Sequence, residues 1–194
     1  MITIYGASGH GGMILEILEN ENIDVMFFDD DISKTSYLNH RVVHELDESF
    51  KYVIGIGDNG IREKVVRKNT NLQFTSAISQ DAILSKSVEI DEGVVVFPGA
   101  VINHSVVIGA HSIINTNASV DHDCKIGSFV HVAPGVTICG GVTIGNGTFV
   151  GAGATILPNL EIGDNVVIGA GAVVTKDIAS KTKVVGIPAK VIFS

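Results

Sequence analysis

The second half of this 194-residue chain carries an unbroken six-residue repeat of branched aliphatic side chains. Ile78 and Leu84 lie in the same phase just before it. A period of six fits neither an α-helix nor a flat strand, but it is typical of a parallel β-solenoid. We therefore expect a coiled β-structure over residues 76–194. The repeat comprises Ile90, Val96, Ile102, Ile108, Ile114, Val120, Ile126, Val132, Ile138, Ile144, Val150, Ile156, Ile162, Ile168 and Val174.

The positions two residues before each member of the repeat are also small or apolar, as at Val94 and Cys124. Because side chains alternate along a strand, both sets point inward and the residue between them points outward. Three hexads form one triangular coil, so residues 18 positions apart stack at the strand spacing of ~4.8 Å. The fifteen hexads predict about five coils. Ser112 and Thr148 also point inward, where we expect their hydroxyls to bond to the backbone.

One outward column of the predicted solenoid is apolar and has a histidine at its centre. A contiguous apolar stripe usually marks an interface, and oligomers usually have closed cyclic symmetry. The column therefore predicts a contact between subunits. The alternative is that β-branched residues simply favour strands. The column consists of Val95, Ile113, His131, Phe149 and Val167.

Residues 1–75 follow a different pattern, in which short apolar strands alternate with helical spacing. Strands are expected at residues 2–5, 24–28 and 52–56, and helices at residues 13–20 and 60–68. We interpret this as an α/β, Rossmann-like βαβαβ domain with its ligand site at the carboxyl ends of the strands. The glycines at positions 6, 9 and 11 do not have the GxGxxG spacing, so we do not expect a dinucleotide cofactor.

Charge and cysteine content argue against several classes of protein. Thirteen basic and 21 acidic residues give a net charge of −8 with no basic cluster, which disfavours nucleic acid or an anionic membrane as a partner. Cys124 and Cys139 lack the spacing of a disulfide framework or a metal site. With no recognisable signal peptide or membrane-spanning run, we expect a cytoplasmic protein that does not insert into a membrane.

The corner at residues 121–124 carries side chains suited to proton transfer. His122 can accept a proton near neutral pH, and Asp123 can orient its ring and stabilise the protonated form. One coil later, Gly140 lets a substrate approach and leaves a backbone N–H for an oxyanion. His131 lies half a coil further, and we expect it within a few ångströms of this site. The alternative is an ordinary turn, in which aspartate is common.

Other residues near this corner are interpreted without a catalytic role. His104 occupies the same corner one coil earlier and has no acid beside it, so we interpret it as a surface turn residue. His111 has the same interpretation. Cys124 points into the core, and no serine or cysteine is placed to form an acyl-enzyme.

With these motifs together, the chain resembles the hexapeptide-repeat, left-handed β-helix acetyltransferases of bacteria. The resemblance rests on the hexads, on His122-Asp123-Cys124 and on the tail Gly186-Ile187-Pro188-Ala189-Lys190. The N-terminal Tyr5-Gly6-Ala7-Ser8-Gly9-His10-Gly11, with Gly57-Asp58-Asn59 and Arg62, is similar to enzymes that acetylate UDP-4-amino-4,6-dideoxy sugars or sialic acid. The resemblance implies that the chain is an acetyl-CoA-dependent sugar acetyltransferase of surface glycan biosynthesis and that its solenoid is left-handed.

The resemblance also implies roles for single residues. It makes His122 the general base and Asp123 its assistant. It places acetyl-CoA between coils of a homotrimer and implies no metal. The residues implied to bind acetyl-CoA are His131, Gly140, Ala152, Ala170 and Pro188. The residues implied to bind the nucleotide sugar are Ser8, Gly9, His10, Asp29, Asp30, Gly57, Asn59 and Arg62.

The sequence departs from the family pattern at two positions and leaves alternatives open. Asp123 stands where the closest enzymes often have glutamate, one methylene longer, and Ala170 stands where glycine is frequent. Transfer to the amino group of a nucleotide sugar is the expected reaction. Transfer to a hydroxyl of sialic acid or another sugar, and a non-catalytic solenoid scaffold, are the alternatives. The sequence does not identify the sugar or the nucleotide.

Overall fold

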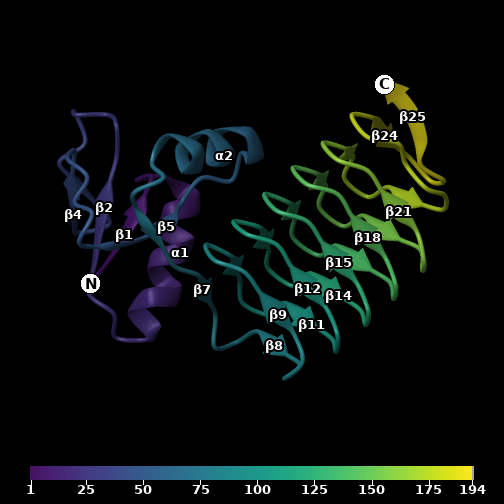
Figure 1. The fold of residues 1–194 in the computed structure, drawn as a ribbon, viewed down its shortest axis with the longest axis horizontal. Coiled ribbons are helices and arrows are strands. Elements are labelled where there is room, and N and C mark those ends of the chain that lie inside the picture. Colours follow the sequence, from purple (N-terminus) through teal and green to yellow (C-terminus); the bar gives the residue numbers. More distant parts are fainter. Residues whose placement is uncertain (194) are drawn as a thin grey trace.

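The computed structural model describes residues 1–193 and contains an N-terminal α/β unit, the head, followed by a β-solenoid (Figure 1). The head has one six-stranded sheet of order β3-β4-β2-β1-β5-β6, parallel except for the antiparallel pair β3 and β4. Its elements are β1 (Ile2–Tyr5), α1 (Gly9–Asn20), β2 (Val25–Phe28), β3 (Ser36–Tyr37), β4 (His40–Val43), β5 (Lys51–Ile54), α2 (Asn59–Lys68) and β6 (Gln73–Phe74).

The head confirms the expected α/β architecture but begins its first helix earlier than predicted. Glycines allow α1 to start at Gly9, because its first turn packs directly on the backbone of the sheet. A Cβ at Gly11 would collide with the carbonyl oxygen of Gly6, and a Cβ at Gly55 would lie 2.8 Å from the Gly11 Cα. The hairpin of β3 and β4 was not predicted, since these short strands lack a clear alternation.

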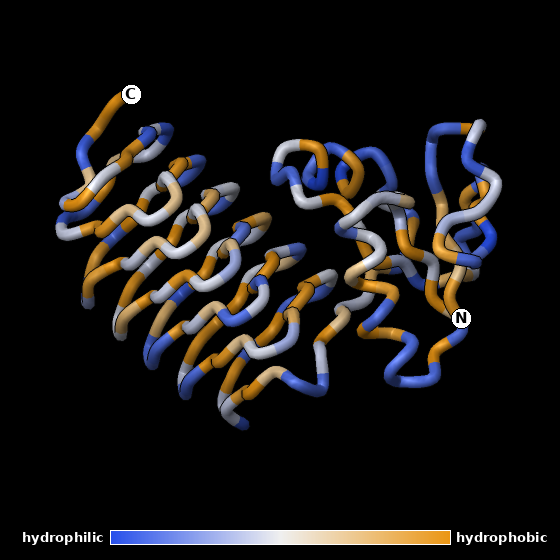
Figure 2. The backbone as a smooth tube through the Cα atoms, turned by 180° about the vertical axis from the view of Figure 1, so that it is seen from behind, coloured by the Kyte–Doolittle hydropathy of each residue, from blue (hydrophilic) through white to orange (hydrophobic). Residues whose placement is uncertain are grey.

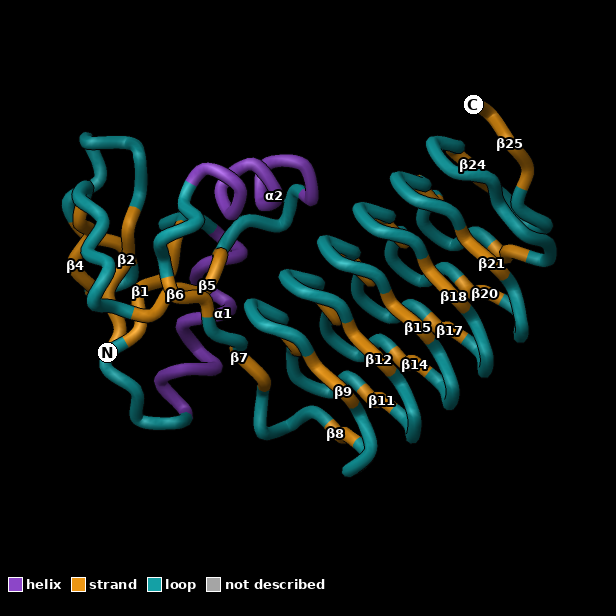
Figure 3. Tube along the Cα trace, in the orientation of Figure 1, coloured by secondary structure: helices purple, strands orange, loops and turns teal. Residues whose placement is uncertain are grey.

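The solenoid has three faces of parallel strands (Figures 1 and 3). Face 1 contains β7 (Ala77–Ile78), β10 (Val95–Val96), β13 (Ile113–Ile114), β16 (His131–Val132), β19 (Phe149–Val150), β22 (Val167–Ile168), β24 (Lys183–Val185) and the antiparallel β25 (Lys190–Phe193). Face 2 contains β8 (Ile83–Leu84), β11 (Val101–Ile102), β14 (Ser119–Val120), β17 (Thr137–Ile138), β20 (Thr155–Ile156) and β23 (Val173–Val174). Face 3 contains β9 (Glu89–Ile90), β12 (Val107–Ile108), β15 (Lys125–Ile126), β18 (Thr143–Ile144) and β21 (Glu161–Ile162).

The register between coils is the predicted one. Paired residues are 18 positions apart, as in Ile113 with His131 and His131 with Phe149. The solenoid is longer than the five coils expected, since face 1 has seven parallel strands. A coil that includes Ile78 precedes the repeat. A shorter coil follows the repeat, and its Lys183 pairs with Val167 of the coil before it.

The repeat residues form the predicted core, and apolar residues recur at matching places in successive coils (Figure 2). The two inward hydroxyls are satisfied by backbone groups, as expected. Ser112 donates to the Gly127 carbonyl at 2.7 Å, and Thr148 donates to the Gly163 carbonyl at 2.8 Å. Within the described residues, no helix is long and apolar enough to cross a membrane.

The head covers the first half of the apolar column on face 1. Val95 and Ile113 are each only 1% exposed and share one hydrophobic cluster with Ile14 and Leu15 of α1. This part of the column is therefore an intramolecular contact, which corrects its assignment to a subunit interface. The end of the column stays open, and Val167 is 37% exposed.

Candidate active site

His122 and Asp123 form the predicted dyad at the corner between face 2 and face 3. The His122 Nδ1 and the Asp123 Oδ2 are 2.8 Å apart. Asp123 has a φ of +60°, and this left-handed turn brings two consecutive side chains together, which an extended strand would point apart. Both side chains are exposed, so a ligand can reach the dyad.

Carboxylates on both sides of His122 favour its protonated form. The hydrogen bond that His122 donates to Asp123 is the main cause that raises the pKa of His122, and the negative charge of Asp121 adds to it. Asp121 accepts the His122 backbone N–H at 2.9 Å and the Asn103 amide at 2.8 Å. These bonds lower the pKa of Asp121 and keep it ionised. Asp121 was not predicted, although an acid before the histidine is visible in the sequence.

Gly140 lies directly beneath the His122 ring, one coil later, as the register predicts. A Cβ at position 140 would lie 2.7 Å from both the Cε1 and the Nε2 of His122. No other residue type fits there without moving the imidazole. Among the described residues, no acceptor bonds to the Gly140 backbone N–H. The imidazole thus packs against a residue whose backbone N–H has no acceptor among the described residues.

His131 lies on face 1 and not beside the dyad of its own chain. The corner that carries His122 is the vertex opposite face 1. The expectation that His131 lies within a few ångströms of the dyad is therefore wrong within one chain. His131 follows His122 by nine residues, which is half a coil, so it lies on the opposite side of the triangular solenoid. Its Nδ1 is 3.0 Å from the Gly57 carbonyl and its Nε2 is 3.1 Å from the Asn115 amide. Burial lowers its pKa to about 4, so the ring is neutral, with Nδ1–H donating to Gly57.

His10 lies near His131, where the head meets face 1. The two ring centroids are 6.1 Å apart, and burial lowers the pKa of His10 to about 4. The buried His10 Nε2 has no partner among the described residues. The groove beside His131 has a volume of about 520 Å³ and runs along the open end of the apolar column. It is lined by Gly57, Asp58, Asn59, Gly60, His131, Gly147, Phe149 and Val167.

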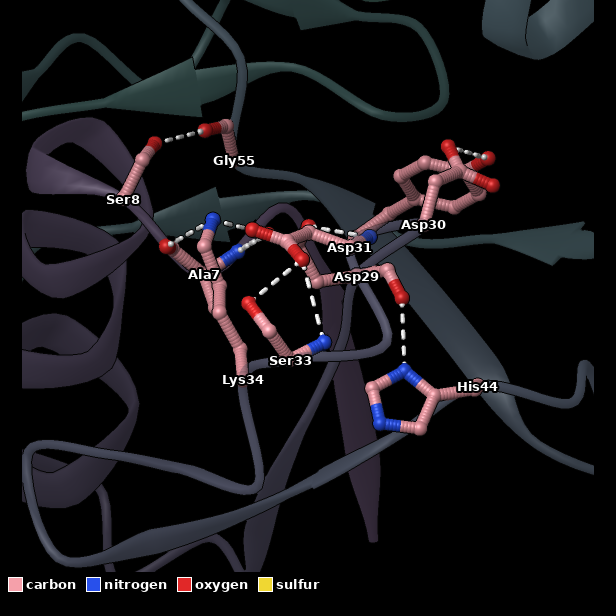
Figure 4. Close-up of polar contacts among 10 residues, drawn as sticks. Ala7, Ser8, Asp29, Asp30, Asp31, Ser33, Lys34, His44 and Gly55 are labelled. Atoms are coloured by element: carbon pink, nitrogen blue, oxygen red, sulfur yellow. Dashed lines mark hydrogen bonds and ion pairs between the residues drawn. The ribbon is translucent and has the colours of Figure 1, made fainter.

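The strand ends of the head carry a second polar cluster (Figure 4). Asp29 accepts the Ala7 N–H at 2.9 Å and the Lys34 ammonium at 2.8 Å. Burial works to raise the pKa of Asp29, but Lys34 and the N–H donors lower it overall. The Tyr5 hydroxyl donates to Asp30 at 3.2 Å. Lys34 was not predicted, because a lysine in a polar loop carries no pattern of its own.

Ser8 is exposed at the same strand ends, where it follows β1. Its hydroxyl is 3.4 Å from the Gly55 carbonyl at the end of β5. The exposed Gly9 begins α1, and a Cβ there would meet nothing within 4 Å. Both residues lie where a ligand of the head was expected.

Known proteins share both parts of this chain. Residues 1–69 match the PglD N-terminal domain, residues 117–152 match the hexapeptide repeat of succinyl-transferase, and residues 141–176 match the bacterial transferase hexapeptide. PerB from Caulobacter crescentus, solved with CoA and GDP-perosamine, is 35% identical over 98% of this chain and 96% of its own, with a TM-score of 0.92. The chain belongs to the hexapeptide-repeat family of bacterial sugar acetyltransferases.

Other relatives agree with this membership. The acetyltransferase domain of PglB from Neisseria gonorrhoeae, solved with acetyl coenzyme A, is 31% identical over 98% of both chains, with a TM-score of 0.94. A further match, the uncharacterized protein L142 of Acanthamoeba polyphaga mimivirus, is 32% identical over 93 residues. That match covers 45% of this chain and only 19% of the viral protein.

In this acetyltransferase, Arg62 and Asn59 fasten the head to the solenoid. The expectation that Arg62 contacts the acceptor is wrong, because its side chain is buried and only 1% exposed. Its Nε donates to the His111 carbonyl at 2.7 Å, and the rest of the guanidinium bonds to carbonyls of both parts and to Asn59. The Asn59 amide donates to the Gly147 carbonyl at 3.0 Å. His111, predicted on the surface, is 2% exposed and stacks on Phe129.

Three further residues that were expected to bind acetyl-CoA lie away from both His122 and His131. Ala152 and Ala170 are exposed and stack on one another at the corner between face 1 and face 2, where the Gly171 N–H donates to the Ala152 carbonyl at 2.8 Å. Pro188 is exposed beside a cavity of about 580 Å³ at the last coil. Face 2 separates these residues from His122. One chain therefore holds the expected site residues in three separate places.

Proposed function

We propose that the protein transfers the acetyl group of acetyl-CoA to the amino group of a nucleotide-linked amino sugar. The observation that carries the proposal is the similarity to PerB, which was solved with CoA and GDP-perosamine and which matches nearly the whole chain. The exposed dyad over Gly140 supports the proposal, since in the proposed reaction His122 would act as the base and the Gly140 N–H as the oxyanion donor.

In the proposed mechanism, the acceptor amine attacks the thioester carbonyl while His122 takes a proton from the nitrogen. The Gly140 N–H donates to the oxygen as it becomes negative, and the C–S bond breaks as the carbonyl reforms. His122 can then return the proton to the leaving thiolate. Asp123 holds the ring with Nδ1 protonated, which leaves Nε2 as the basic atom.

We further propose that the protein is a homotrimer whose site is shared between subunits. The dyad corner, His131 with the head, and Ala152 with Ala170 lie in three places on one chain. Packing the dyad corner of one subunit against face 1 of the next would bring them together. Such a contact joins two different patches, and a ring of three subunits closes it. The open end of the apolar column, at Phe149 and Val167, would lie in this contact.

Within this arrangement, we assign the nucleotide sugar to the head, residues 1–75, and acetyl-CoA to the domain predicted at residues 76–194, which comprises the solenoid and the C-terminal tail. Support comes from Ser8, His10, Asp29 and Asp30, which lie at or near the carboxyl ends of the parallel strands, where open α/β sheets bind ligands. Gly57 at the end of β5 belongs to the same edge.

An acceptor screen tests the proposed reaction. The protein is incubated with acetyl-CoA and a panel of UDP- and GDP-linked amino sugars, and the release of CoA thiol is measured together with the product mass. We expect thiol release with a nucleotide amino sugar and an amide product. Release with sialic acid alone would establish the hydroxyl-transfer alternative. Failure of acetyl-CoA to bind at micromolar concentration would establish a scaffold.

A further inference from the structure

The histidine that precedes His122 by one coil lies against the dyad. The ring centroids of His104 and His122 are 5.4 Å apart and their planes differ by only 9°. The Asp123 N–H donates to the His104 carbonyl at 3.1 Å, and the Asn103 amide donates to Asp121. These bonds hold the two turns in register. His104 is thus more than the isolated surface turn residue that its sequence suggests.

The two sides of the His122 ring differ in chemistry. On the side of the later coils lies Gly140, which has no side chain and whose backbone N–H bonds to no acceptor among the described residues. On the side of the earlier coils, the His104 imidazole lies parallel to the ring. A ligand that reaches His122 Nε2 from solvent therefore has Gly140 on one side and His104 on the other.

This asymmetry orients the reaction that we propose, and the following step rests on that proposed function. The thioester oxygen must point to the Gly140 N–H, which places the acetyl group on the side of the later coils. The attacking nitrogen approaches the carbonyl carbon from above the plane of the thioester, at roughly a right angle to the C=O bond, within reach of His122. Because the thioester occupies the side of Gly140, the space left for the sugar ring that carries this nitrogen is on the side of His104.

The His104 side chain is free to bind such a ring. It is exposed, and its Nδ1 has only a long contact of 3.4 Å to the Ser105 hydroxyl. No contact of its Nε2 occurs within the described residues. A neutral imidazole offers one donor and one acceptor, which suits a sugar hydroxyl. We propose that His104 binds the acceptor by a hydrogen bond to a hydroxyl adjacent to the reacting amine.

Steady-state kinetics of three variants tests this proposal. His104→Ala removes the hydrogen bond, and we expect the KM for the nucleotide sugar to rise roughly 3- to 10-fold, the worth of one such bond. The KM for acetyl-CoA and the inhibition constant of UDP or GDP should stay unchanged, since neither touches the sugar subsite. His104→Gln retains a donor and an acceptor and should recover part of the loss. His40→Ala, a surface histidine of the head bonded to Glu19, is the control.

Each outcome separates the subsite from other roles of His104. A lower kcat with an unchanged KM for the sugar would mean that His104 only positions His122, and it would overturn the proposal. An equal rise in both KM values would do the same. Unaltered kinetics in an active enzyme would also contradict it. If wild-type protein acetylates no nucleotide amino sugar, the proposed function fails first, which the wild-type assay reveals independently.

Discussion

At the scale of single residues, the environment of His122 sets the pH at which the enzyme can work. The His122 side chain is 49% exposed, and its two carboxylate neighbours affect its basicity more than burial does. An imidazole accepts a proton only when it is neutral. The activity should therefore fall as the pH drops through the raised pKa of His122.

Asp123→Asn removes the carboxylate that contributes most to this raised pKa. Without it, the pKa of His122 falls, so the acidic limb of the kcat/KM profile should move to lower pH. The maximal rate should fall less than in His122→Ala, whose kcat should drop by ~10²–10⁴. Asp121→Asn is the matched control, and it should shift the limb less. A limb that stays in place in Asp123→Asn would mean that another group governs it.

At the scale of the coils, a substitution at Gly140 tests whether the stacking of residue 140 against His122 sets the position of the base. Gly140→Ala puts a methyl group 2.7 Å from two atoms of the His122 ring, so the ring must turn away. The backbone at position 140 does not have a positive φ, so the fold should tolerate alanine. We expect kcat to fall by roughly 10²-fold, because small misplacements of reacting groups are costly. Thermal melting should change little. Full activity would show that the ring position is not critical.

Substitutions in helix α2 test whether the hydrogen bonds of Arg62 hold the head on the solenoid. Arg62→Met leaves several buried carbonyls without a donor, and we expect the free energy of unfolding to fall by about 3 kcal/mol. Arg67→Met is the matched control on the same helix, since that exposed arginine pairs with Glu63 alone among the described residues and its loss should cost less than about 0.5 kcal/mol. Denaturant titrations measure both. Equal stabilities would mean that apolar packing alone joins the two parts.

The elements also show what the sequence can predict. A repeat with branched residues at fixed positions determines which side chains share a corner, so the pairing of His122 with Asp123 and its placement over Gly140 could be predicted. The repeat does not say what covers a face, so the contact of Val95 and Ile113 with the head was missed. Arg62 belongs to a motif, and its burial depends on carbonyls nearly 70 residues away in the chain.

At the scale of the whole molecule, the open end of the apolar column should lie between subunits. Val167→Asp places a charge in this contact and should dissociate the trimer and reduce activity together. Val107→Asp is the matched control, since it is similarly exposed, at 39% against 37%, on a face whose other outward residues include charges. Light scattering and thiol release measure assembly and activity. An active monomeric Val167→Asp protein would contradict a shared site.

Complementation between two variants that we expect to be inactive tests the central claim most directly, namely that His122 of one subunit works with His131 of the next. His122→Ala and His131→Ala proteins are co-refolded in equal amounts, and acetyl transfer is compared with each variant alone. If the site is shared, mixed trimers contain sites with both histidines intact, and about one quarter of the wild-type activity should return. If the mixture stays as inactive as its components, the two residues do not act across a subunit boundary, and the account is wrong.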